Sequence, residues 1–148
     1  MQVYTDVQNR FDHTMSEDPV PLDAPPPPGP VATWQAALRQ GRFRLQRCAA
    51  CGQAVFPPRR LCPGCGSVGL EWFEPSGLGT VYAVTVVARS ADKGGPYNVV
   101  LIDLDEGVRL MSRVDGIEPQ AVAIGARVQA YIADGATEPV LAFRPLSA

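Results

Sequence analysis

Histidine, lysine and long apolar runs are all scarce in this chain of 148 residues. The single histidine, His13, lies in a polar N-terminal stretch, and the single lysine is Lys93. A Ser–His–Asp or Cys–His arrangement within the folded part is therefore excluded. No apolar run approaches the roughly 18 residues that a membrane-spanning helix needs, and no signal peptide opens the chain. We therefore expect a cytoplasmic protein.

Charge is also sparse, and it is unevenly spread. Charged residues make up 19% of the chain, and the formal net charge is −2. Residues 34–69 hold six bases and no acid, whereas residues 1–33 and 70–148 each carry a net charge of −4. Bulk positive charge for nucleic-acid binding is absent. The basic segment instead marks where a phosphate-bearing ligand or an acidic partner would bind.

The first third of the chain divides into an arm, a helix and a strand. Seven of the residues 19–30 are proline, which predicts a disordered or extended arm over residues 1–30. Trp34, Ala37 and Leu38 form one apolar stripe, so a helix is expected within residues 31–41, with Thr33 as its N-cap and Gly41 just past its end. Alternation over residues 42–47 predicts a strand leading into the cysteines.

Residues 70–148 show the pattern of a small β-barrel. Strands are expected at residues 79–89, 97–104, 108–114, 127–133 and 140–143, with a tight turn ending at Gly107 between the second and the third. Five strands without a long amphipathic helix favour a mainly β protein with a five-stranded OB-fold barrel. An SH3-like barrel or a small open sandwich is the structural alternative.

All four cysteines fall into two Cys-x-x-Cys pairs. Cys48 and Cys51 form the first, Cys62 and Cys65 the second, and a glycine follows each pair directly. Two such knuckles supply the four thiolates of a tetrahedral structural zinc site within residues 42–69. Four protein ligands close the shell and leave no position for substrate, so we expect one structural zinc per chain. Rubredoxin-like iron and two disulfides are the alternatives.

Few residues are left for catalysis or for nucleic-acid binding. Lys93 lies in an exposed loop, and a hairpin turn accounts for Asp103, Asp105 and Glu106, so this chain is not expected to be an enzyme on its own. An OB-fold that binds single-stranded nucleic acid needs aromatic platforms in a basic groove. The barrel segment is acidic, which weakens this alternative function. Its candidate aromatic residues are Tyr82, Tyr97, Tyr131 and Phe143.

The chain strongly resembles the family called domain of unknown function 35. The segments that carry the resemblance are residues 43–52, 56–59 and 62–67 around the cysteines and residues 77–82, 99–107 and 124–128 in the barrel. The resemblance covers residues 33–143 and leaves the Pro-rich arm outside. It implies an N-terminal helix (31–41), a rubredoxin-like zinc ribbon (42–69) and an OB-fold domain (70–148). It also implies a non-catalytic accessory subunit of a thiolase-like acyl-CoA enzyme complex, of thiolase or aldolase type, whose catalytic residues belong to the partner.

This implied role gives the basic segment two functions to test. Arg59 and Arg60, between the knuckles, are candidates for binding the phosphates of CoA. The apolar tip that precedes them is a candidate partner interface together with the helix. The residues of this candidate interface are Trp34, Phe56, Pro57 and Pro58.

Overall fold

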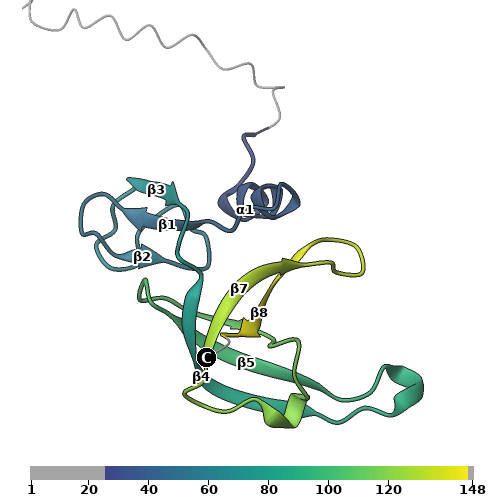
Figure 1. The fold of residues 1–148 in the computed structure, drawn as a ribbon. Coiled ribbons are helices and arrows are strands. Elements are labelled where there is room, and N and C mark those ends of the chain that lie inside the picture. The colour runs from purple at the N-terminus through teal and green to yellow at the C-terminus, as the bar shows by residue number, and fades with distance from the viewer. Residues whose placement is uncertain (1–25, 147–148) are drawn as a thin grey trace, which may run out of the picture.

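The computed structural model describes residues 26–146. His13 and most of the expected Pro-rich arm therefore lie outside the described residues. Within the described part, no helix is both long enough and apolar enough to cross a membrane. Residues 26–146 form one α-helix, a three-stranded ribbon and a five-stranded barrel (Figure 1).

Helix α1 (Pro30–Arg39) begins earlier than the sequence indicated. Gly29 is its N-cap and Pro30 occupies the first turn, where a missing N–H costs nothing. The expectation of Thr33 as N-cap was wrong: its hydroxyl lies inside the helix and donates to the Gly29 carbonyl at 3.2 Å. The C-terminal end is as predicted. Gly41 has a φ of +73°, and the Arg42 N–H closes the turn on the Ala37 carbonyl at 2.9 Å.

Three short antiparallel strands form the ribbon, in the order β2-β1-β3. Their bounds are β1 (Leu45–Cys48), β2 (Ala54–Val55) and β3 (Leu70–Phe73). Strand β3 pairs with β1 from Cys48↔Leu70 to Leu45↔Phe73. The ribbon's sheet thus extends to residue 73, past the boundary expected at residue 69, because β1 needs a partner on its second edge.

The remaining strands form a closed barrel, in the order β6-β5-β4-β7-β8. Phe143 closes it: its N–H donates to the Arg113 carbonyl at 3.0 Å, and its own carbonyl accepts from the Asp115 N–H at 2.8 Å. The five-stranded OB-type barrel is confirmed. The strands are β4 (Leu78–Val87), β5 (Tyr97–Leu104), β6 (Arg109–Ser112), β7 (Arg127–Ala133) and β8 (Val140–Pro145).

One hydrophobic core joins the barrel to the ribbon. Phe143 and Ile102 are fully buried at its centre, and Leu45 and Ala54 of the ribbon belong to the same cluster. A second, smaller cluster of Cys48, Val55 and Cys62 lies inside the ribbon. The two modules therefore share apolar surface instead of being joined by a free linker.

The β4–β5 hairpin extends well beyond the barrel, with the short 3₁₀ turn η1 (Ala91–Lys93) at its tip (Figure 1). A bulge at Tyr82 shifts the register, so that Val81 pairs with Ile102 whereas Ala83 pairs with Leu101. On the inner side, the buried Asn98 side chain holds Val114 through two hydrogen bonds of 2.7 and 2.8 Å. The inner side of the hairpin is thus covered by the segment that leads from β6 to the turn η2 (Pro119–Ala121).

Candidate metal centre

The two cysteine pairs form two turns of the same geometry. In the first, the Gly52 N–H donates to the Cys48 carbonyl at 2.8 Å; in the second, the Gly66 N–H donates to the Cys62 carbonyl at 2.9 Å. Gly52 and Gly66 have φ values of +76° and +75°, a backbone conformation that favours glycine. The glycine behind each pair was the sequence signal for a knuckle, and the structure confirms it.

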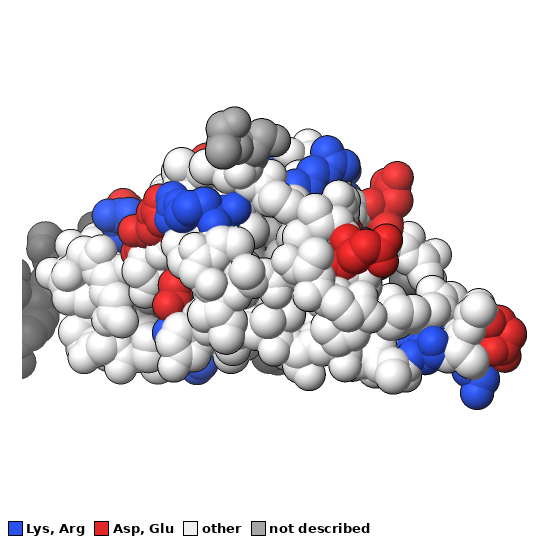
Figure 2. Space-filling view, turned by 60° about the horizontal axis from the view of Figure 1, so that its bottom comes forward, with Lys and Arg blue, Asp and Glu red and all other residues white. Residues whose placement is uncertain are grey.

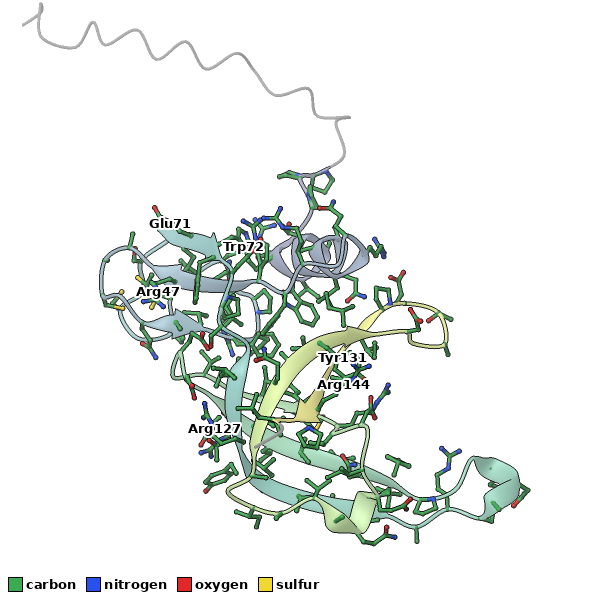
Figure 3. All side chains as sticks on the ribbon, in the orientation of Figure 1. Arg47, Glu71, Trp72, Arg127, Tyr131 and Arg144 are labelled. Carbon is green, nitrogen blue, oxygen red and sulfur yellow. The ribbon has the colours of Figure 1, made fainter. Side chains whose placement is uncertain are left out.

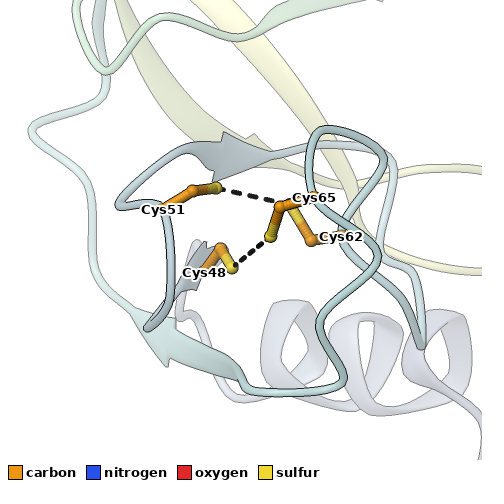
Figure 4. Close-up of side chains that lie close together, drawn as sticks. All are labelled: Cys48, Cys51, Cys62 and Cys65. Carbon is orange, nitrogen blue, oxygen red and sulfur yellow. Dashed lines mark hydrogen bonds between the residues drawn. The ribbon is translucent and has the colours of Figure 1, made fainter.

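The knuckles face each other and bring all four sulfurs together (Figure 4). Every Sγ atom lies within 4.8 Å of the other three. The closest pairs run between knuckles: Cys48 Sγ is 3.6 Å from Cys65 Sγ, and Cys51 Sγ is 3.7 Å from Cys62 Sγ. A tetrahedral site with Zn–S bonds of about 2.3 Å separates its sulfurs by about 3.8 Å. The four thiols fit a zinc ion in size and donor type. They are free cysteines, not disulfides.

The electrostatics of the cluster also favour a cation at its centre. The backbone N–H of Cys51 lowers the pKa of the Cys48 thiol to about 6. The N–H of Ser67 acts in the same direction on Cys65, but the neighbouring Cys48 and Cys51 thiols raise the pKa of Cys65 to about 12. Without a cation, one thiolate therefore opposes ionisation of the next. A bound Zn²⁺ removes this conflict because it stabilises every thiolate at once.

Arg59 and Arg60 follow strand β2, in the loop that leads to the second knuckle. The buried Gln46 side chain holds the Arg59 backbone, accepting from its N–H at 2.7 Å and donating to its carbonyl at 3.0 Å. Arg60 lines a groove of about 250 Å³ together with Trp72. Trp72 lies on β3, on the side of the ribbon that faces helix α1 (Figure 3). Sequence reasoning missed Gln46 and Trp72, although a glutamine in a strand that enters a knuckle was a visible signal.

Trp34 and Phe56 meet between the helix, the ribbon and the barrel. Their rings are in an edge-to-face contact, with centroids 5.6 Å apart. Both line an apolar pocket of about 420 Å³ whose far wall includes Met111 and Leu141. Phe56 also packs against the shared core, while Pro57 is exposed and Pro58 half-buried. The structure thus gathers Trp34 and Phe56 in one pocket, which neither Pro57 nor Pro58 lines.

The three carboxylates at the turn between β5 and β6 each accept at least one hydrogen bond. Asp103 accepts from Arg109 at 2.6 Å and Asp105 from Arg127 at 2.7 Å, and these arginines lower the pKa of both carboxyl groups. Glu106 accepts from the Ser76 N–H at 2.6 Å. These acids stabilise the barrel surface.

The four aromatic residues considered for nucleic acid do not form one platform. Phe143 is fully buried in the core. An arginine guanidinium lies over each tyrosine ring: Arg109 at 3.3 Å from Tyr82, and Arg144 at 3.8 Å from Tyr131 (Figure 3). Arg89 covers Tyr97 at 5.7 Å. In each case the arginine occupies the ring face on which a base would stack.

Two family profiles match adjacent parts of the chain. Residues 35–71 match the rubredoxin-like zinc ribbon domain of ChsH2, and residues 72–133 match the C-terminal OB-fold domain of ChsH2. Together they cover the ribbon and most of the barrel. The ribbon profile therefore contains all four clustered cysteines.

Individual relatives agree with these matches. A probable enoyl-CoA hydratase alpha subunit of Thermomonospora curvata is 39% identical over 66% of this chain, although the chain spans only 31% of that protein. A DUF35 domain-containing scaffold protein of Methanocaldococcus jannaschii is 36% identical over 68% of this chain and 74% of its own.

Among solved structures, a chain of the one titled "Ltp2-ChsH2(DUF35) aldolase" is 34% identical. It superposes with a TM-score of 0.70 over 82% of this chain and 98% of its own. The cysteine cluster, the ribbon-plus-barrel fold and the matching relatives lead to one assignment: this chain belongs to the DUF35 family of zinc-ribbon and OB-fold proteins.

Proposed function

We propose that this chain is a non-catalytic accessory subunit of a thiolase-like acyl-CoA enzyme complex, of thiolase or aldolase type. The observation that carries the proposal is the likeness to a chain of the structure titled "Ltp2-ChsH2(DUF35) aldolase", which extends over 98% of that chain. Sequence similarity to a probable enoyl-CoA hydratase alpha subunit and to a DUF35 domain-containing scaffold protein supports the same role. In such a complex this chain supplies a rigid scaffold, and the partner supplies the reacting groups.

The chemistry of the described residues supports a structural role for the metal. All four ligand positions of the zinc site are filled by cysteine, so a bound ion has no open position for substrate. The hairpin carboxylates are held in ion pairs. The ion therefore fixes the ribbon loops, which in turn fix the positions of Arg59, Arg60 and Phe56.

The proposal includes a ligand, CoA, which binds at the ribbon. Arg59 is held by its backbone, and Arg60 faces a groove that Trp72 also lines. An arginine fork binds phosphate oxygens, and an aromatic wall suits an adenine ring. Arg60→Ala is expected to weaken CoA binding about tenfold in calorimetry on the assembled complex. Lys93→Ala, which removes one positive charge from the exposed hairpin tip, is the control and leaves the affinity unchanged.

The pocket lined by Trp34 and Phe56 is the proposed binding site for the partner. It is apolar and lies at the junction of three elements, which suits an apolar side chain of the partner. Pro57 and Pro58 stiffen the adjoining tip. The partner's anchor would thus bind where the helix, ribbon and barrel are held together.

Co-purification tests the proposed function. The full-length chain, tagged and expressed in the cells that produce it, is expected to retain a thiolase-fold enzyme in a fixed ratio, identified by mass spectrometry. A chain that stays monomeric and retains no such enzyme would contradict the proposal. Salt-sensitive binding to single-stranded oligonucleotides, measured by gel shift, would favour the nucleic-acid alternative instead.

A further inference from the structure

The outer face of the β4–β5–β6 sheet is apolar where a solvated sheet face is expected to be polar. Antiparallel sheets that cover a core on one side alternate apolar and polar residues. Strand β5 alternates buried and half-buried residues, yet its outward positions from the hairpin tip are Tyr97, Val99 and Leu101. The first outward charge on this strand is Asp103, which is paired with Arg109. Strand β5 is therefore apolar on both faces, as a strand is when both of its faces are buried.

The register extends this apolar face over the two neighbouring strands. Leu101 lies opposite Ala83 on β4 and Met111 on β6, and Val99 lies opposite Thr85. Directly opposite residues point to the same side of a sheet. We call the resulting surface the outer sheet face. Its residues are Ala83, Thr85, Tyr97, Val99, Leu101 and Met111.

Within residues 26–146 no helix or strand covers the outer sheet face, although the Arg89 guanidinium lies over the Tyr97 ring at 5.7 Å. Met111 is 72% exposed and Tyr97 42% exposed. The inner side of the same hairpin, in contrast, is covered through Asn98 and Val114. The lower side of the molecule, shown in Figure 2, has a broad area of uncharged side chains, with acidic and basic groups both around it and within the visible face. A sheet face with exposed apolar residues is characteristic of a protein interface.

We propose that the outer sheet face is the surface on which the enzyme subunit of the complex docks. This inference rests on the proposed function, which supplies the occupant. The charge pattern fits it: the strands' outward positions from Ala83 to Leu101 are neutral, and the adjacent charges at Asp103 and Arg109 neutralise each other. The complementary surface is therefore an apolar, uncharged patch of a folded protein, not an acidic peptide or a lipid headgroup layer.

Met111 connects this face to the partner pocket. It belongs to the outer sheet face through its pairing with Leu101, and it also lines the pocket of Trp34 and Phe56. One partner can thus contact the sheet and insert an anchor into the pocket without leaving a gap between them. Tyr97 is the aromatic residue at the opposite end of the face, on the projecting hairpin.

Charge insertion tests the proposal, because a lysine in an apolar interface core is costly. The double variant Thr85→Lys/Met111→Lys changes two exposed positions, so the fold is retained; zinc content and circular dichroism check this. The control is Thr137→Lys, the same change at an exposed loop position between β7 and β8. We expect the double variant to reduce retention of the thiolase-fold subunit about tenfold or more, and the control to retain it fully.

The outcomes separate this inference from the proposed function. If the wild-type chain retains no thiolase-fold subunit, the proposed function fails and takes the inference with it. If the double variant retains that subunit as well as the wild type does, the inference alone is overturned. A photo-crosslinker placed at position 99 adds a second readout. A cross-link to the enzyme subunit supports docking here, whereas one to a second copy of this chain overturns it.

Discussion

Each knuckle contributes one buried and one exposed sulfur ligand. Cys48 and Cys62 are 1% and 2% exposed and form the ribbon's own small core with Val55, while Cys51 and Cys65 face solvent. The buried ligands therefore serve the metal and the packing at once. Loss of a buried ligand should disturb the ribbon more than loss of an exposed one.

Cys62→Ser tests this difference. A serine keeps the size of the side chain but is a poor zinc ligand at neutral pH, so zinc content is expected to fall from one per chain to nearly none. Elemental analysis by mass spectrometry measures the metal, and hydrogen exchange measures the opening of β1 and β2. Ala49→Ser, an exposed change within the first knuckle, is the control and should keep its zinc. Full zinc content in Cys62→Ser would contradict the four-ligand site.

Gly79 is a second residue whose role is steric. A Cβ atom there would lie 2.8 Å from the Asp103 carbonyl oxygen and 2.8 Å from the Ile102 side chain. Gly79→Ala is therefore expected to destabilise the barrel by about 1–3 kcal/mol, measured by urea unfolding. Gly29→Ala, where a Cβ meets nothing within 4 Å, is the control and should cost only about 0.5 kcal/mol, because alanine is a poorer N-cap than glycine. Equal losses at both positions would disprove the crowding at Gly79.

Residue types with strong local rules were predictable from the sequence. The cysteine pairs and Gly41 were placed correctly because their spacing and backbone conformation are local properties. Thr33 was not, since Gly29 and Pro30 offered an earlier helix start. Gln46 and Trp72 were missed because their roles depend on contacts across the ribbon.

At the scale of elements, helix α1 is attached to the barrel by polar contacts at its outer end. Arg39 forms a two-pronged ion pair with Glu138 at 2.7 Å, and the Gln35 amide donates to the Pro139 carbonyl at 3.2 Å. Glu138 lies in the loop between β7 and β8. This loop therefore holds the helix that forms one wall of the Trp34 pocket.

Acid should loosen this attachment. Hydrogen bonding and charge from Arg39 lower the pKa of Glu138 below its ordinary value of 4.5. A lowered carboxyl pKa stabilises the fold above the ordinary pKa, and this contribution is lost as the pH falls through the folded-state pKa. We expect faster hydrogen exchange in α1 below about pH 4. Glu138→Gln should show the faster exchange already at pH 7, whereas Glu118→Gln, at an exposed site, should not; unchanged exchange in Glu138→Gln would refute the role.

The sequence predicted the strands well but not the faces they present. Hairpin residues 97–104 and strand 127–133 were placed at their observed bounds. The bulge at Tyr82 was not visible in a run of β-branched residues. Because it shifts the side-chain alternation, Val84 faces the core and Ala83 faces outward. Alternation alone would have continued the inward series of Val81 through Ala83.

At the scale of the whole molecule, the ribbon and barrel should lose stability together. Leu45 and Ala54 of the ribbon lie in the barrel's core cluster, so collapse of the ribbon exposes barrel residues to water. Zinc removal with a chelator is expected to lower the melting temperature of the full chain by roughly 5 °C or more, in a single transition followed by circular dichroism. A barrel that melts at an unchanged temperature would show that the modules are independent.

The fold class was predictable because five strands and two knuckles leave few architectures open. The position of β3 was not, since its pairing with β1 is long-range and its four residues carry no turn signal of their own. The same holds for closure through Phe143, which pairs with Val114, 29 residues earlier in the chain. Contacts of this kind are decided by the assembled core and not by local sequence.

The shared core makes the joint between ribbon and barrel stiff, and this has a mechanical consequence. Strand β3 ends at Phe73 and β4 begins at Leu78, and both lie against one apolar cluster. The ribbon and the barrel therefore move as one rigid body. A partner that binds the β4–β5 hairpin also fixes the orientation of the metal knuckles and of Arg60 at the far end of the molecule. Partner binding at the hairpin and the placement of Arg60 are thus mechanically coupled.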